Sequence, residues 1–460
     1  MIGMLKPFLC WLFLFCGSCI VNAQQHALQQ FLATDGLQHA SVGIAIRAVS
    51  DGKEILNHRA ETALTPASVL KLLPTWFALQ EKGEKYRFQT TVYHTGEIQD
   101  SVLRGDLVVE AGGDPTLNSR YFPQTSFLDE LLNFIQQQGV CCIKGTIRVE
   151  GAVKGEEIPG SWLWEDISNY YGALYLPFTY RDNLFSLRFQ TKEPGSQAKL
   201  LSVVPELSQV KIRNEVRASS EKDKNNAWIF GGPYSEVLAV RGTLPAHRTA
   251  ITVRGALHDP ATVFLAELKD ALQNRQIIVE EQEFLHHEKK RWFVFQSPTL
   301  SEIVYHTNKV SVNLFAEALG FLIGEETSEK GIQLQLEQMG LDVSGMILKD
   351  VCGLSLMNAV PAQLFTDLLV HIAQQNSSVF LNSLPVAGQD GGLNGYCQAF
   401  PELKGRIQAK TGSMSGIRGL SGYLIRKDGT RLAFTILVNH YTCSVSQLQK
   451  AIGHFLRSFL

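Results

Sequence analysis

Three short motifs, and the distance between the first two, constrain what this chain can fold into more than any other feature. They are Ser-Val-Leu-Lys at Ser68–Lys71, Ser-Val-Asn at Ser311–Asn313 and Lys-Thr-Gly at Lys410–Gly412. In this order they supply a nucleophile, candidate bases, an amide and a further cation, which are the components of a serine acyl-transfer site. Roughly 240 residues separate the first two motifs, more than one compact catalytic domain needs. The spacing therefore predicts a catalytic domain interrupted by an insertion.

Residues 1–23 differ from the rest of the chain. Lys6 is their only charge, an apolar run follows from Phe8 to about Phe15, and small or short residues end at Ala23. The pattern predicts a secretory signal peptide over residues 1–23 and a periplasmic mature protein. A membrane anchor is one alternative, although the run is short for a bilayer. Lipoprotein processing at Cys19 is another.

Composition excludes several classes of protein. Hydrophobic residues make up 45% of the chain and charged residues 19%, which is typical of globular domains and not of disorder. A net charge of −2 without a basic excess argues against a nucleic-acid partner. No later segment could cross a membrane, so at most peripheral membrane contact is expected. The five cysteines after the leader show neither a disulfide framework nor zinc-ligand spacing, and we expect no metal and no cofactor.

Hydrophobic periodicity predicts the order of elements. Residues 24–85 read as a helix, a β-hairpin and a helix that Thr65 caps and Pro74 kinks. Residues 86–285 read as inserted, largely strand-forming sequence with a nested strand-rich domain at about 184–245. Residues 286–460 then return to helices, a β-hairpin and a final amphipathic helix, so that they form the second catalytic segment.

The surroundings of Ser68 favour a reactive serine over an ordinary surface one. Its predicted place near a helix start offers free backbone N–H groups and a favourable dipole. The i, i+3 spacing puts Lys71 on the same face, and apolar neighbours would favour a neutral amine able to take the Ser68 proton. A second Ser-x-x-Lys, Ser219–Lys222, lies in a polar run and is interpreted as a solvated loop.

The second motif has two interpretations. In an active site, Ser311 would relay a proton to the leaving group, while Asn313 would donate to a substrate amide and accept from Lys71. Taken alone, Ser-Val-Asn is better explained as a plain helix N-cap.

The third motif ends a predicted strand, whose edge could accept an extended peptide. Lys410 and Thr411 are candidates to hold the terminal carboxylate of a substrate, and Gly412 allows close backbone approach. The N–H groups of Ser413 and Ser68 are candidates for an oxyanion hole. The alternative is a strand that simply ends in a turn.

The chain resembles the class C penicillin-binding proteins, the D-alanyl-D-alanine carboxypeptidase/endopeptidase family of the penicillin-binding protein 4 type. The resemblance covers nearly the whole predicted mature chain. Besides the three motifs, it is carried by Pro66-Ala67, residues 112–117 (Gly-Gly-Asp-Pro-Thr-Leu), Trp162, Trp164, Asp166, Tyr171–Ala173, Asp182-Asn183, residues 300–319, Gly353–Ser355 and Asp390-Gly391. One departure is Asp350–Leu356, where the family commonly ends in arginine and this chain has Leu356.

The resemblance implies an α+β fold, in which a serine β-lactamase/transpeptidase-like domain, an antiparallel sheet with helices, is interrupted by inserted strand-rich domains. It implies cleavage of D-Ala-D-Ala or of cross-links in peptidoglycan stem peptides through an acyl-enzyme on Ser68, with β-lactam antibiotics as covalent inhibitors. It also implies that Asp166 and Tyr171 line the pocket for the donor peptide's diamino-acid side chain. Whether the protein forms a homodimer is not decided by the sequence.

Two other functions stay open at this point. A β-lactamase would need an extra base for fast deacylation, which the sequence does not identify, and the large insertion argues against it. A wall-binding protein with a retired site is the non-enzymatic alternative, against which the three intact motifs argue.

Overall fold

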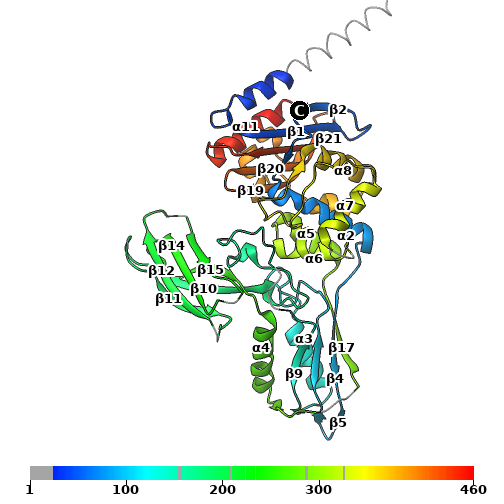
Figure 1. Cartoon of the computed structure of the whole chain (residues 1–460), viewed down its shortest axis with the longest axis vertical. Helices are drawn as coiled ribbons and strands as arrows, with labels where there is room; N and C mark the ends of the chain where they lie inside the picture. Colours follow the sequence, from blue (N-terminus) through cyan, green and yellow to red (C-terminus); the bar gives the residue numbers. More distant parts are fainter. Residues whose placement is uncertain are drawn as a thin grey trace, which may run out of the picture.

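The computed structural model describes residues 24–153, 158–207, 210–222, 224–233, 235–284, 288–324 and 327–460. The predicted signal peptide over residues 1–23 lies outside the described residues. Figure 1 shows an elongated molecule with a sheet and its covering helices at one end and the inserted domains at the other. No helix in the described ranges combines the length and the apolar character that crossing a bilayer requires.

The catalytic end is built on a five-stranded antiparallel sheet to which both ends of the chain contribute. The strand order is β19-β20-β21-β1-β2, with bounds Ile407–Met414, Ile417–Ile425, Arg431–Asn439, Ser41–Ala48 and Glu54–His58. β1 pairs with β21 from Ser41 opposite Asn439 to Ala48 opposite Leu432. The predicted hairpins are confirmed, and strands from both ends of the chain pair within this one sheet.

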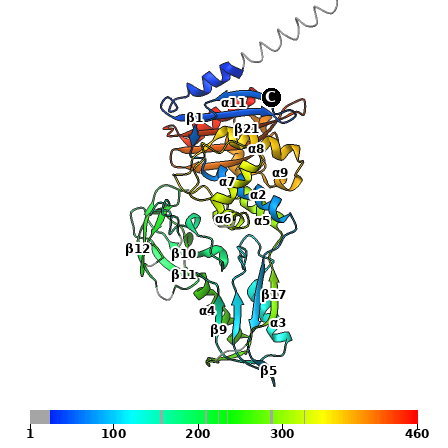
Figure 2. The ribbon, with the colours of Figure 1, turned by 45° about the vertical axis from the view of Figure 1, so that its right-hand side comes forward.

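Helices cover both faces of this sheet (Figure 2). On one face, α11 (Val445–Arg457) packs with the helix at 24–32, and the rings of Phe31 and Phe455 stack at 5.5 Å. The other face carries a second apolar core built on the remaining helices. These are α2 (Leu72–Lys82), α5 (Leu300–Lys309), α6 (Asn313–Phe321), α7 (Ser328–Gln338), α8 (Ala362–Gln374) and α9 (Ser378–Ser383).

The helix after Thr65 differs from the prediction in two ways. It begins as a 3₁₀ helix, η1 (Ala67–Lys71), which no side chain caps, because the Thr65 hydroxyl donates instead to the carbonyl of Leu356. The α-helix α2 starts only at Leu72. Pro74 therefore lies in the first turn, where backbone N–H groups lack helical partners in any case, and the predicted interior kink is wrong.

The insertion contains two four-stranded sheets with α3 (Phe127–Gln137) and α4 (Pro260–Asn274). One sheet has the order β17-β4-β7-β9, with bounds Lys290–Gln296, Gln89–His94, Leu107–Glu110 and Ile147–Glu150. The other has the order β16-β8-β6-β5, with bounds Ile278–Glu280, Cys142–Lys144, Val102–Arg104 and Glu97–Gln99.

The nested part consists of two three-stranded sheets around its own apolar core. Their orders are β11-β10-β15, with bounds Lys199–Val204, Leu184–Gln190 and Ile251–Ala256, and β12-β14-β13, with bounds Lys211–Ser219, Val237–Pro245 and Asn226–Phe230. Because β15 pairs with β10, we propose that this part extends to Ala256 and not only to about residue 245. Because β17 pairs with β4, we also propose that the second catalytic segment starts near Leu300 and not at residue 286.

Two glycines let the sheet approach the serine motif. A Cβ added at Gly412 would lie 2.4 Å from the carbonyl oxygen of Pro66, and one at Gly419 would lie 2.9 Å from it. No side chain fits in this contact, so the glycine of the third motif brings β19 against the backbone of the first.

Candidate active site

Ser68 and Lys71 lie within hydrogen-bond distance on η1. Lys71 Nζ is 3.0 Å from Ser68 Oγ, 2.6 Å from Asn313 Oδ1 and 2.5 Å from the carbonyl oxygen of Cys352. The Lys71 side chain is completely buried, and this burial lowers the pKa of its amine. A neutral amine has two N–H bonds and one lone pair. As the structure has them, all three contacts accept from Nζ; if the amine is neutral, the Ser68 hydroxyl donates to its lone pair instead.

Asn313 connects this pair to the insertion. It is the first residue of α6, and its Nδ2 donates to the backbone carbonyl of Tyr171 at 2.7 Å. Its side chain therefore accepts from Lys71 and donates to the insertion at the same time, which fixes the orientation of the amide. The plain N-cap interpretation of Ser311 is wrong, since Val312 occupies the N-cap position of α6.

Ser311 and Lys410 form a second hydroxyl–amine pair. Lys410 Nζ lies 2.9 Å from Ser311 Oγ and 2.9 Å from the carbonyl oxygen of Thr411. Lys410 is buried, and burial together with the nearby Lys71 lowers the pKa of its amine well below the ordinary value. The three motifs thus supply two buried amines, each beside a serine hydroxyl.

The backbone is strained at two of these motifs. Ala67, directly before Ser68, has φ 47°, and Ser311 has φ 62°. Left-handed conformations at non-glycine residues cost free energy and are concentrated at functional sites.

The outer edge of β19 is covered along only half of its length. The N–H of Ala409 donates to the carbonyl of Pro385, so this half is occupied by residues 385–387. Backbone groups alternate in direction along a strand, so Thr411 and Ser413 also direct their N–H and C=O groups outward. No strand of the described residues lies beyond them. Among the described residues, this half of the edge therefore has no backbone strand beside it.

Asp166 and Tyr171 lie together in the insertion. The Tyr171 hydroxyl donates to Asp166 Oδ1 at 3.0 Å, and burial raises the pKa of the Asp166 carboxyl. The Tyr171 backbone also accepts from Asn313, so the pair borders the catalytic groups. The exposed rings of Tyr170 and Trp228 both contact the Tyr171 ring.

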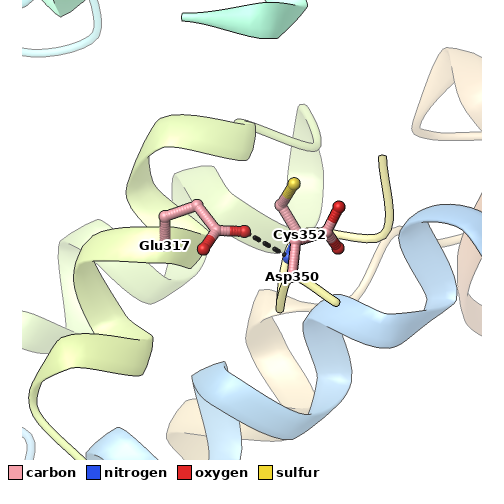
Figure 3. Close-up of side chains that lie close together, drawn as sticks. All are labelled: Glu317, Asp350 and Cys352. Atoms are coloured by element: carbon pink, nitrogen blue, oxygen red, sulfur yellow. Dashed lines mark hydrogen bonds between the residues drawn. The ribbon is translucent and has the colours of Figure 1, made fainter. Parts of the chain in front are cut away.

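Three buried groups beside Lys71 were missed by sequence reasoning. Glu317, Asp350 and Cys352 have potential ligand atoms within 4.8 Å of one another (Figure 3). Glu317 Oε1 accepts from the N–H groups of Val351 and Cys352, at 3.0 and 2.8 Å. Burial and the Asp350 charge raise the pKa of Glu317 to about 8.

This cluster is a poor metal site. Asp350 accepts four hydrogen bonds, at 2.6–2.8 Å, from the N–H groups of Gly353 and Ser355 and from the side chains of Trp162 and Asn358. Its lone pairs are therefore occupied by protein donors. The cluster instead holds the backbone of residues 350–355, whose Cys352 carbonyl contacts Lys71. The Cys352 carbonyl could not be found from the sequence, because every residue has a backbone carbonyl. Asp350, an acidic residue shortly before Gly353, is a sequence feature that could have pointed to this segment.

The comparisons with known proteins agree with this geometry. The family model described as the D-Ala-D-Ala carboxypeptidase 3 (S13) family matches residues 24–459. A D-alanyl-D-alanine carboxypeptidase of Actinomadura sp. (strain R39) is 27% identical over 449 residues, which cover 90% of this chain and 80% of the relative. The D-alanyl-D-alanine carboxypeptidase DacB of Haemophilus influenzae is 23% identical, over 88% of this chain and 86% of that protein.

Solved structures share the fold. The crystal structure of penicillin binding protein 4 from Haemophilus influenzae has a TM-score of 0.76 at 21% identity, and the match covers 93% of this chain and 97% of that one. The same protein complexed with a β-lactam has a TM-score of 0.73. The predicted α+β fold, a transpeptidase-like domain with strand-rich insertions, is confirmed.

Proposed function

Because the chain belongs to the D-Ala-D-Ala carboxypeptidase 3 (S13) family of hydrolases, we propose that it hydrolyses D-Ala-D-Ala ends and peptide cross-links of peptidoglycan stem peptides through an acyl-enzyme on Ser68. The observation that carries the proposal is the contact of Lys71 Nζ with Ser68 Oγ, at 3.0 Å, in a completely buried setting. Such a setting gives a serine a local base, as nucleophilic catalysis requires.

Acylation begins with proton transfer. Neutral Lys71 accepts the Ser68 proton while its own N–H groups stay bonded to Asn313 Oδ1 and the Cys352 carbonyl. Ser68 Oγ then forms a bond to the scissile carbonyl carbon. The resulting oxyanion accepts from the N–H groups of Ser68 and Ser413, which are the donors proposed for the oxyanion hole.

Collapse of this intermediate breaks the peptide bond. The leaving amine takes a proton from the Ser311 hydroxyl, and Ser311 regains a proton from the Lys71 ammonium of the first step through the adjacent Lys410 amine, so that both lysines return to their starting state. The product is a Ser68 ester and a free terminal D-alanine. Water then attacks the ester with the same amines as bases, which returns Ser68 to its hydroxyl form and releases the shortened peptide.

Substrate recognition follows the edge of β19 and the insertion. The peptide adds to the open half of β19 as an extended strand, with Thr411 and Lys410 near its terminal carboxylate and Gly412 leaving room for its backbone. Asp166, held by Tyr171, accepts from the ammonium of the diamino-acid side chain. A β-lactam enters the same site and acylates Ser68 covalently, and the substrate implies a periplasmic location after removal of residues 1–23.

The experiment that tests the proposal is covalent labelling with a fluorescent penicillin, followed by peptide mapping. The label is expected on Ser68 and on no other residue. Ser68→Ala removes only an oxygen and should lose the label while keeping the thermal transition of the wild type. A label that persists in this variant would refute the assignment.

A further inference from the structure

A row of aromatic rings lies on the outer face of the nested sheet β12-β14-β13. Trp228 and Phe230 are two apart on β13, the last strand of that order, so their side chains share one face. Ile229 between them is buried in the core of the nested part, which shows that the two rings point away from it. The Trp228 side chain is 43% exposed, and its ring centroid lies 6.4 Å from that of Tyr171.

The segment 164–171 extends this row of rings. Asn169 fixes the segment to β13, because its side chain accepts from the N–H of Ile229 at 3.0 Å and donates to the carbonyl of the same residue at 3.2 Å. The Trp164 side chain is 62% exposed, and its ring centroid lies 5.1 Å from that of Phe230. The rings therefore form one continuous surface, here called the aromatic surface, which consists of Trp164, Tyr171, Trp228 and Phe230.

Charged side chains continue the same face across the sheet. Arg241 on β14 lies directly opposite Trp228, and Glu215 on β12 lies directly opposite Arg241. Arg241 Nε donates to Glu215 Oε2 at 2.7 Å, and Arg213 Nε lies 2.6 Å from Glu215 Oε1. Both arginine side chains are more than half exposed, at 52% and 65%. An exposed indole ring thus lies beside a row of oriented hydrogen-bonding groups.

A sugar ring matches this combination of groups. The C–H bonds of a pyranose form an apolar face, and they carry a small positive charge that is attracted to the electron-rich face of an aromatic ring. Its hydroxyl and acetamido groups lie at the edge of the ring, where guanidinium groups can donate to them and carboxylates can accept from them. Exposed apolar patches with a polar border mark sites of interaction.

The connectivity of the substrate brings a sugar close to this surface. In a peptidoglycan stem peptide, two residues separate the diamino acid from the lactyl group of the sugar, and two extended residues span roughly 7 Å. The Tyr171 hydroxyl lies 3.0 Å from Asp166, the proposed partner of the diamino-acid side chain, and the Tyr171 ring belongs to the aromatic surface. The sugar that carries a bound stem peptide is therefore within reach of these rings.

We propose that the aromatic surface, together with Arg241 and Glu215, binds the glycan strand to which the stem peptide is attached, with one sugar ring stacked on Trp228. The inference rests on the proposed function and extends it from the peptide to the sugar. It gives the nested part a role that the chemistry at Ser68 does not require. The enzyme then prefers stem peptides that are still attached to sugar over free peptides, because only the former contact both surfaces.

The test compares a disaccharide pentapeptide with the free pentapeptide of the same sequence, by release of the terminal D-alanine. The wild-type enzyme is expected to show the lower KM for the disaccharide pentapeptide. Trp228→Ala should raise that KM by about 2- to 10-fold, the range that one aromatic contact supplies, and should leave kcat and the KM of the free pentapeptide unchanged. Trp228→Phe keeps a ring and should retain most of the preference. Leu201→Ala, an exposed apolar residue on the other nested sheet, is the matched control.

Direct binding separates the sugar from the chemistry. Ser68→Ala protein should bind peptide-free glycan strands, prepared by digestion of peptidoglycan with an amidase, and addition of Trp228→Ala should weaken this binding by a similar factor. Absence of binding would overturn the proposal, and so would equal wild-type KM values for the two substrates or equal losses on both in Trp228→Ala. Arg241→Ala tests the same surface if the tryptophan variant does not fold. A protein that labels with penicillin at Ser68 but shows no preference for the disaccharide substrate refutes this surface alone, whereas failure to label refutes the proposed function.

Discussion

Asn313 and Glu317 lie one turn apart on α6, and together they determine two of the three contacts of Lys71. Asn313 Oδ1 accepts from Lys71 directly, at 2.6 Å. Glu317 acts indirectly. Its Oε1 accepts from the N–H groups of Val351 and Cys352 and so fixes the backbone whose Cys352 carbonyl contacts Lys71. The i, i+4 spacing puts both side chains on one face of the helix. A single helical face thus orients the Lys71 amine.

The first prediction concerns Lys71. Below its pKa the amine holds a proton and cannot accept another, so the rate of penicillin acylation should rise with pH and level off above the lowered pKa. Lys71→Arg should lose about 10²–10⁴-fold in acylation rate, since arginine cannot act as a base. Stopped-flow acylation over a pH series measures both. Lys82→Arg, at the end of α2, is the control, and a Lys71→Arg enzyme within a few-fold of wild type would contradict the role.

The second prediction concerns Glu317 and stability. Its carboxyl is protonated in the folded state up to about pH 8 but ionises near 4.5 in the unfolded chain. The folded state therefore binds the extra proton between these values, and this group makes stability fall as pH rises from about 4.5 to 8. Glu317→Gln keeps an acceptor but has no proton to lose, so it should flatten that part of the curve. Urea unfolding at pH 5 and pH 8 measures the free energy of unfolding at each pH. The same decrease between the two pH values in both proteins would reject the prediction.

The third prediction separates wall recognition from β-lactam reactivity. Asp166→Asn should weaken turnover of peptides with a free diamino-acid amine by roughly 1.5–3 kcal/mol, the range for a hydrogen bond to a charged group. Penicillin lacks that ammonium and should acylate at nearly the wild-type rate. Glu165→Gln, a change of the exposed neighbouring carboxylate, is the control. Equal losses on peptide and penicillin would make Asp166 structural.

The fourth prediction concerns Gly353. Its φ is 82°, and a Cβ there would lie 2.0 Å from the Ala67 carbonyl oxygen. Gly353→Ala should therefore displace the backbone before Ser68 and reduce both stability and acylation. Gly340 has a similar φ of 74° with nothing within 4 Å, so Gly340→Ala isolates the backbone strain of about 1–2 kcal/mol. Thermal unfolding and labelling of both variants give the comparison, and equal behaviour would show that the contact with Ala67 does not matter.

Much of the architecture followed from patterns that act locally. Alternation predicted the hairpins of the catalytic sheet, and the spacing of the motifs predicted the insertion. The start of the nucleophile helix was predicted wrongly because a capping threonine looks the same whether its hydroxyl bonds to the helix or, as at Thr65, to a distant carbonyl. The contact of the Cys352 carbonyl with Lys71 could not be predicted, because it depends on which segments meet in space.

The pairing of β1 with β21 also has a consequence for the order of folding. Two neighbouring strands of the catalytic sheet, β1 and β21, come from the first and last parts of the described chain, with the whole insertion between them. During synthesis, the insertion can fold while β1 is paired only with β2 and its other edge still lacks β21. Contacts of such long range form slowly and leave strand edges exposed until they do. The protein should therefore gain activity only after its last strand has arrived, so that a prematurely terminated chain has a serine motif but no working hydrolase.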